Sequence, residues 1–142
     1  MKSRVLFLCT GNSARSQMAE GYLRHVAGEE FDALSAGVAP KMLHPLAVEV
    51  MREAGIDIRG QRSKEVREFS GVPVDFVVTV CNNAREQCPI FPAVKRRVHW
   101  DLEDPAASGG TEAEKLAMFR TVRDQIFAHI MGLVREQSSA RD

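Results

Sequence analysis

Hydrophobic and polar positions divide the chain into short apolar segments and longer segments with a polar face. Residues 5–8 are all apolar, and residues 75–80 are rich in β-branched side chains, which is typical of buried strands. Near the C-terminus, apolar residues recur at intervals of three and four, as in a helix with one buried face. The pattern predicts strands over residues 3–8, 31–36, 75–80 and 94–100, helices over residues 14–28, 45–54, 64–69 and 114–136, and a loop over residues 101–110.

Two of these helices carry boundary signals. Pro45 suits the first turn of its helix, and Gly55 suits the end of that helix. Ser63 stands before the short helix, and we expect its hydroxyl to cap that helix.

The alternation of strands and helices predicts an α/β fold, with a four-stranded parallel sheet flanked by helices on both faces. In such a sheet, ligands bind beyond the carboxyl ends of the strands. Cys9 follows the first predicted strand, Cys81 the third, and residues 100–104 the fourth. We therefore expect these three segments to meet at one edge of the sheet.

Composition limits the possible classes of protein. The 142 residues suffice for one domain, which we expect over residues 1–136, followed by a polar, frayed tail over residues 137–142. The 19 basic and 19 acidic residues cancel, so neither nucleic acid nor an anionic membrane is an expected partner. The apolar run near the N-terminus is too short for a signal peptide or a membrane span, and we expect a cytoplasmic monomer.

The segment from Cys9 to Ser16 reads Cys-Thr-Gly-Asn-Ser-Ala-Arg-Ser and joins the first strand to the first helix. Backbone N–H groups and the positive end of the helix dipole should form a concave anion site there. The anion-binding residues would be Thr10, Gly11, Asn12, Ser13, Ala14, Arg15 and Ser16. The Arg15 guanidinium can clamp two oxygens of a tetrahedral anion. Cys9 would be a thiolate nucleophile beneath the anion; the alternative is a small buried hydrophobic residue.

A second pair of thiols stands at Cys81 and Cys88, seven residues apart in a segment rich in Asn and Gln. We expect a short helix to begin at Cys81 and to end at Pro89. In a regular helix the two cysteines would lie roughly 10.5 Å apart along the axis. A disulfide needs Cα atoms within about 7 Å, so the two thiols can bond only if the segment unwinds. Two unrelated thiols are the alternative, and a zinc site is disfavoured because no Cys-x2-Cys pair or His cluster accompanies them.

Asp104 and Pro105 lie in the predicted loop after the fourth strand. A carboxyl group on a loop close to the anion could protonate a leaving oxygen, although an Asp-Pro pair alone also fits an ordinary turn. The four histidines are dispersed along the chain, and we expect each of them to be a surface or packing residue.

The segment Val-Leu-Phe-Leu-Cys-Thr-Gly-Asn-Ser-Ala-Arg-Ser resembles the low-molecular-weight tyrosine phosphatase superfamily. Ser-Gln-Met-Ala-Glu after the loop, and Thr-Val-Cys followed by Cys-Pro, are similar to its thioredoxin-coupled arsenate reductases. The resemblance implies a flavodoxin-like sheet and a general acid at Asp104. The phosphatases usually carry Tyr after the Asp-Pro pair, whereas Ala106 stands here, which suits a small inorganic substrate.

The resemblance implies reduction of arsenate to arsenite through a disulfide cascade, with no organic cofactor and no metal. Cys9 would attack arsenic while Ser16 hydrogen-bonds its thiolate. Cys81 would then displace arsenite from Cys9, and Cys88 would free Cys9 by bonding to Cys81. Thioredoxin is the expected reductant, with glutaredoxin or a small thiol as alternatives. Phosphate and sulfate would compete for the anion site.

Two alternative functions use the same residues. One is a phosphomonoester hydrolase of the low-molecular-weight phosphatase type, which would have no use for Cys81 and Cys88. The other is a non-catalytic anion or redox sensor, which would need neither Arg15 nor Asp104.

Relatives of this type often hold a potassium ion beside the anion loop, at residues that match Asn12, Glu20 and Ser35. A carboxylate completes that site in many of them, whereas the matching position here is Lys64. We expect the Lys64 ammonium to occupy the place of the ion, bonded to Glu20 and to the loop amide of Asn12. The alternative is a solvated surface lysine.

Overall fold

The computed structural model describes residues 2–81, 84 and 94–141, with side chains described through residue 137. Its elements are β1 (Ser3–Cys9), α1 (Arg15–Ala27), β2 (Phe31–Gly37), α2 (Pro45–Glu53), the 3₁₀ turn η1 (Val66–Phe69), β3 (Phe76–Thr79), β4 (Arg96–His99), the 3₁₀ turn η2 (Pro105–Ala107) and α4 (Glu112–Arg141). Within this described part of the chain, no helix is apolar over a length that would cross a membrane.

The four strands form one parallel sheet in the order β2-β1-β3-β4, which confirms the predicted fold class. Cys9 pairs with Gly37 at the end of β2, and Leu8 pairs with Thr79 at the end of β3. Thr79 in turn pairs with His99 at the end of β4. The carboxyl ends of all four strands therefore meet at one edge, where parallel sheets bind ligands.

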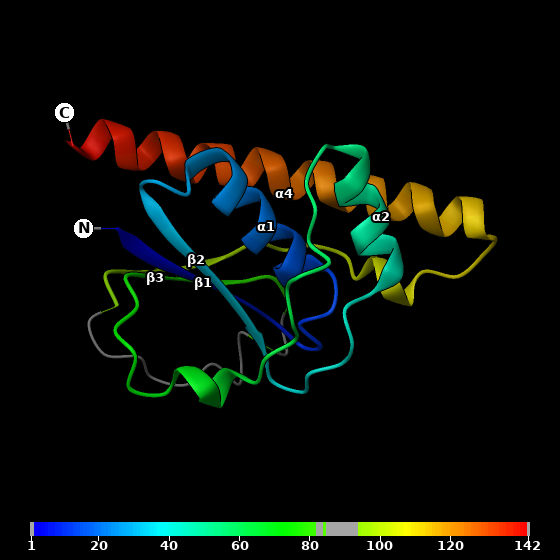
Figure 1. Cartoon of the computed structure of the whole chain (residues 1–142), viewed down its shortest axis with the longest axis horizontal. Coiled ribbons are helices and arrows are strands. Elements are labelled where there is room, and N and C mark those ends of the chain that lie inside the picture. Colours follow the sequence, from blue (N-terminus) through cyan, green and yellow to red (C-terminus); the bar gives the residue numbers. More distant parts are fainter. Residues whose placement is uncertain (1, 82–83, 85–93, 142) are drawn as a thin grey trace.

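Side chains of β1 alternate between two cores. Val5 and Phe7 pack into the larger core with α1, α2 and α4, whereas Leu6 and Leu8 face a smaller core with Val66 of η1. Figure 1 shows the three described α-helices on one side of the sheet and η1 on the other. This burial on both faces explains why β1 reads as a continuous apolar run rather than an alternating one.

Three local predictions need correction. Ser63 does not cap η1; Glu65 occupies the N-cap, because its side chain and that of Glu68 bond reciprocally to the backbone. The predicted loop after β4 contains the turn η2, which the Asp104 carboxylate caps by accepting a hydrogen bond from the N–H of Ala106 at 3.0 Å. Helix α4 continues through Arg141, so the backbone expected to form a frayed tail is helical.

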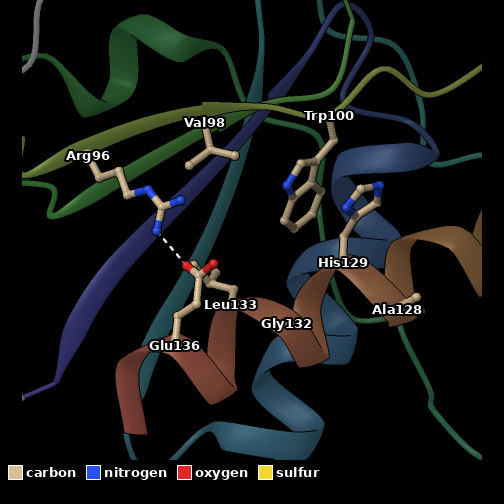
Figure 2. A pocket seen from close by; sticks show the side chains of 8 residues that line it. All are labelled: Arg96, Val98, Trp100, Ala128, His129, Gly132, Leu133 and Glu136. Atoms are coloured by element: carbon tan, nitrogen blue, oxygen red, sulfur yellow. Dashed lines mark hydrogen bonds and ion pairs between the residues drawn. The ribbon is translucent and has the colours of Figure 1, made fainter. Parts of the chain in front are cut away.

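A hollow of about 310 Å³ lies between β4 and α4 (Figure 2). Trp100 forms one wall, where its ring stacks on His129 at 4.7 Å between centroids. The ion pair between Arg96 and Glu136 forms the opposite wall. Burial lowers the pKa of His129, which agrees with its predicted role as a packing residue.

Candidate active site

The loop between β1 and α1 follows Cys9, and its backbone bonds to the sulfur of that residue. Cys9 is buried, with 3% of its surface exposed. The N–H of Asn12 donates to Cys9 Sγ at 3.1 Å, and the Ser16 hydroxyl lies 2.8 Å from the same atom. Ser16 Oγ already accepts a bond from Asn12 Nδ2 at 2.8 Å, so its own proton is available for the sulfur. Both groups direct a hydrogen-bond donor at the sulfur and hold it at the base of the loop.

Polar groups behind the loop hold Asn12 in place. Besides Ser16, Asn12 Nδ2 donates to Ser35 Oγ at 2.9 Å. Ser35 Oγ in turn donates to Glu20 Oε1 at 2.7 Å. The residues that the sequence placed around a cation, Asn12, Glu20 and Ser35, therefore form one buried chain of hydrogen bonds.

Arg15 reaches across the sheet edge from the first turn of α1. Its guanidinium donates to the carbonyl of Val80 at 3.2 Å and to that of Leu102 at 3.0 Å. The same group lies 3.7 Å from Asp104 Oδ2. The arginine side chain is 8% exposed and the aspartate side chain 45%, so a fixed cation faces a carboxylate that solvent reaches. Strand ends that are distant in sequence thus hold Arg15 beside both the loop and the predicted acid.

A cavity of about 280 Å³ opens over this loop. It is lined by Cys9, Thr10, Gly11, Ser13, Ala14, Arg15, Lys41, Met42, His44, Asp104 and Ala106. The predicted nucleophile, cationic clamp and acid therefore share one cavity. Ala106 supplies only a methyl group to the wall, and these lining residues include no aromatic side chain apart from the imidazole of His44. The cavity suits a compact anion better than an aromatic phosphoester.

Cys81 lies just beyond the end of β3 and contacts the same loop. Its Sγ is 3.2 Å from Thr10 Oγ1, and it accepts a bond from the N–H of Ala84 at 3.3 Å. Because Thr10 directly follows Cys9 in the chain, its contact with Cys81 places the second thiol beside the loop that holds the first. Cys88, most of the predicted helix over residues 81–89 and its predicted unwinding lie outside the described residues.

Lys64 is largely buried, with 11% of its side chain exposed, and its ammonium lies 3.5 Å from Glu20 Oε1. The predicted bond from this ammonium to Asn12 is wrong: Nζ donates to the carbonyl of Arg62, and the backbone N–H of Lys64 donates to Asn12 Oδ1 at 2.8 Å. An ammonium can only donate, and Asn12 Oδ1 already accepts hydrogen bonds from the backbone N–H of Lys64 and from Gln17 Nε2. Burial lowers the pKa of Lys64, with the Glu20 carboxylate opposing this effect.

Four residues of the site were not expected from the sequence: Lys41, Met42 and His44 in the cavity wall, and Gln17 behind the loop. His44 caps α2, accepting a bond from the N–H of Leu46 at 3.1 Å, and it lines the cavity. Burial lowers the pKa of His44, against the effect of Asp104. Gln17 is fully buried behind the anion loop. Its signal in the sequence is its position: a polar residue in the first turn of a helix can reach back to the preceding loop.

Comparison with known proteins places the chain in a family. Residues 4–141 match the model of the low molecular weight phosphotyrosine protein phosphatase family. The arsenate reductase of Oceanobacillus iheyensis is 48% identical over 125 residues, which cover 88% of this chain and 90% of that protein.

Solved structures agree with this placement. An arsenate reductase in the phosphate binding state superposes with a TM-score of 0.83 at 34% identity, covering 96% of this chain and 98% of that one. A thioredoxin-dependent arsenate reductase of Corynebacterium glutamicum gives a TM-score of 0.75 at 27% identity, covering 98% of this chain and 63% of that one. The chain belongs to the low molecular weight phosphotyrosine protein phosphatase family and groups within it with the arsenate reductases, as its motifs predicted.

Proposed function

We propose that this chain reduces arsenate to arsenite with electrons from its own cysteines, and that thioredoxin restores those cysteines. One observation carries the proposal: the hydroxyl of Thr10, the residue after the buried nucleophile Cys9, lies 3.2 Å from a second thiol, Cys81. A phosphate ester hydrolase needs only the first thiol. The similarity to arsenate reductases, one of them thioredoxin-dependent, supports the same reaction.

The first step is substitution at arsenic. Arsenate binds in the loop, where the backbone N–H groups and Arg15 neutralise its charge. The Cys9 thiolate forms a sulfur–arsenic bond, and an arsenic–oxygen bond breaks. Asp104 donates the proton with which that oxygen leaves as water. Asp104 Oδ2 lies 3.7 Å from the Arg15 guanidinium, so the carboxyl group of Asp104 is within reach of an anion that Arg15 binds.

The second step reduces arsenic. The Cys81 thiolate attacks Cys9 Sγ, a disulfide forms, and the sulfur–arsenic bond breaks with its electron pair left on arsenic, so that arsenite departs. Cys88 then attacks Cys81, which releases Cys9 as a thiolate and leaves a disulfide between Cys81 and Cys88. A dithiol such as thioredoxin reduces that disulfide by exchange.

No organic cofactor takes part in this cycle, because the thiols supply both electrons. We place the enzyme in the cytoplasm, where thiols are kept reduced, and we expect it to act as a monomer. Phosphate and sulfate, which resemble arsenate in shape and charge, should compete for the loop.

Hydrolysis of phosphomonoesters is the second candidate function, since the matched family is that of the low molecular weight phosphotyrosine protein phosphatases. The small side chain of Ala106 in the cavity wall disfavours an aromatic phosphoester as the main substrate. We therefore expect phosphatase activity only as a weak side reaction.

The test is consumption of NADPH that depends on arsenate, with thioredoxin and thioredoxin reductase as the electron source. Parallel reactions contain glutaredoxin and glutathione instead. We expect sustained turnover with thioredoxin, and none with a Cys81→Ser variant that still hydrolyses p-nitrophenyl phosphate. Sustained arsenate reduction by that variant would contradict the cascade, and no reduction by the wild type with any of these donors would favour the phosphatase.

A further inference from the structure

Asn12 has an unusual backbone conformation that serves the nucleophile. Its φ is 47°, and it is the one residue other than glycine with a positive φ in the part of the chain that the structure describes. Residues with a Cβ atom rarely adopt this left-handed conformation unless the surroundings hold them in it. Here that conformation accompanies the bond from the Asn12 N–H to Cys9 Sγ, at 3.1 Å.

The fully buried side chain of Gln17 holds both oxygens of Asn12. Gln17 Nε2 lies 3.0 Å from the backbone oxygen of Asn12 and 3.0 Å from Asn12 Oδ1. It also lies 2.8 Å from the carbonyl oxygen of Arg62. Three acceptors around one nitrogen mean that the amide cannot be reversed, because a reversed amide would place its own oxygen against all three.

Gln61 supports this orientation from the opposite side. Its Nε2 donates to Gln17 Oε1 at 2.7 Å and to the backbone oxygen of Gln17 at 3.0 Å. The Gln17 amide is thus fixed at both ends, with its donor directed at Asn12.

We propose that Gln17 is a positioning residue for the nucleophile. By holding the two oxygens of Asn12, it keeps that residue left-handed, so that the Asn12 N–H points at Cys9 Sγ and Asn12 Nδ2 points at Ser16. Gln17 itself does not touch Cys9. The effect of Gln17 passes through Asn12. This proposal rests on the role of Cys9 as nucleophile proposed above.

The test compares alkylation of two thiols in one sample. Iodoacetamide reacts with the reduced full-length protein at a fixed pH, and mass spectrometry of peptides follows Cys9 and Cys81 separately. Gln17→Met keeps the length of the side chain but removes the donor. We expect Cys9 to react about tenfold more slowly, because loss of the bond from the Asn12 N–H to a charged Cys9 sulfur implies an effect of that size. The rate of Cys81 should change less than about twofold. The matched control, Gln125→Met on an exposed part of α4, should change neither rate.

A second background separates positioning from general loosening of the fold. Glycine adopts a left-handed conformation without help, so Asn12→Gly should no longer need Gln17 to hold the backbone. In that background, Gln17→Met should slow Cys9 by less than about twofold, which is a coupling that a purely structural role would not produce.

Three results would overturn the proposal: an unchanged Cys9 rate in Gln17→Met, an equal fall at Cys81, or the same tenfold fall in both backgrounds. If Gln17→Met does not fold by circular dichroism, Gln61→Ala replaces it, since this variant removes the bond that orients Gln17. An unchanged Cys9 rate in Gln61→Ala would then count against the role of Gln17. Alkylation needs no arsenate, so its outcome is independent of whether the protein reduces arsenate.

Discussion

Gly37 at the end of β2 lies directly against the anion loop, and replacing it by alanine should disable the site with little damage elsewhere. A Cβ atom at this position would stand 2.6 Å from the backbone oxygen of Thr10 and 2.8 Å from the backbone nitrogen of Asn12. Both are backbone atoms of the loop, so no side-chain rotation can relieve the contact. That nitrogen also donates to Cys9 Sγ at 3.1 Å, and the overlap therefore acts on the nucleophile itself.

The size of the effect follows from these distances. Non-bonded contacts need more than about 3.2 Å, so the loop or β2 must move by about half an ångström. Gly37 is fixed on its other side, because it pairs with Cys9 in the sheet and its N–H donates to the carbonyl of Lys64 at 2.8 Å. Overpacking of this kind costs about 1–3 kcal/mol of stability, and misplacing reacting groups by about 1 Å costs about 100-fold in rate. We expect Gly37→Ala to remain folded and to lose between 10-fold and about 100-fold in kcat for arsenate.

The assay is arsenate turnover with thioredoxin, run beside a thermal melt of each variant. Gly60→Ala is the matched control, since a Cβ there meets no atom within 4 Å. Gly60→Ala should keep the activity of the wild type. Retention of wild-type kcat by Gly37→Ala would refute the claim that the loop has no room to move. Absence of a melting transition would show that Gly37→Ala is unfolded, and its loss of activity would then say nothing about the site.

Four further predictions follow from the site. Cys9→Ser should abolish both arsenate reduction and hydrolysis of p-nitrophenyl phosphate, and continued hydrolysis would remove Cys9 from the role of nucleophile. Cys88→Ser should release one arsenite per enzyme and then stall as a Cys9–Cys81 disulfide, which peptide mapping detects; repeated turnover with thioredoxin would contradict this order. Potassium chloride should stabilise the wild type no more than choline chloride does at equal ionic strength. Lys64→Asp should gain stability from potassium specifically, because the ammonium no longer competes with the ion. A potassium-specific gain in the wild type would refute the idea that Lys64 takes the place of the ion. Burial lowers the pKa of His44 below its ordinary value of 6.5, so its contribution to stability is present above that pH and is lost as the pH falls below it. Replacing His44 by Asn, which also caps helices, should weaken the decline of the melting temperature below about pH 6.5, and an unchanged decline would assign it to other groups.

The sequence by itself determined the order of the elements and the location of the nucleophile. A strand, a cysteine, a loop and the first turn of a helix are contiguous, so local geometry brings Cys9 and Arg15 to the same loop. Burial on both faces leaves the apolar runs that mark β1 and β3, and the alternation of strands with helices makes the sheet parallel. This order also places Cys81 and Asp104 at the carboxyl edge.

Only the tertiary structure decided which side chains the loop relies on. Gln17 is adjacent to the motif, but its partner Gln61 is 44 residues away, and Arg15 meets Leu102 across 87 residues. Such contacts depend on how strands and helices pack, which local propensity does not encode. Ser63 shows the limit. It is a good helix cap by its residue type, but its hydroxyl donates to the backbone oxygen of Asn12 at 2.8 Å, a partner 51 residues away, and Glu65 caps the turn instead.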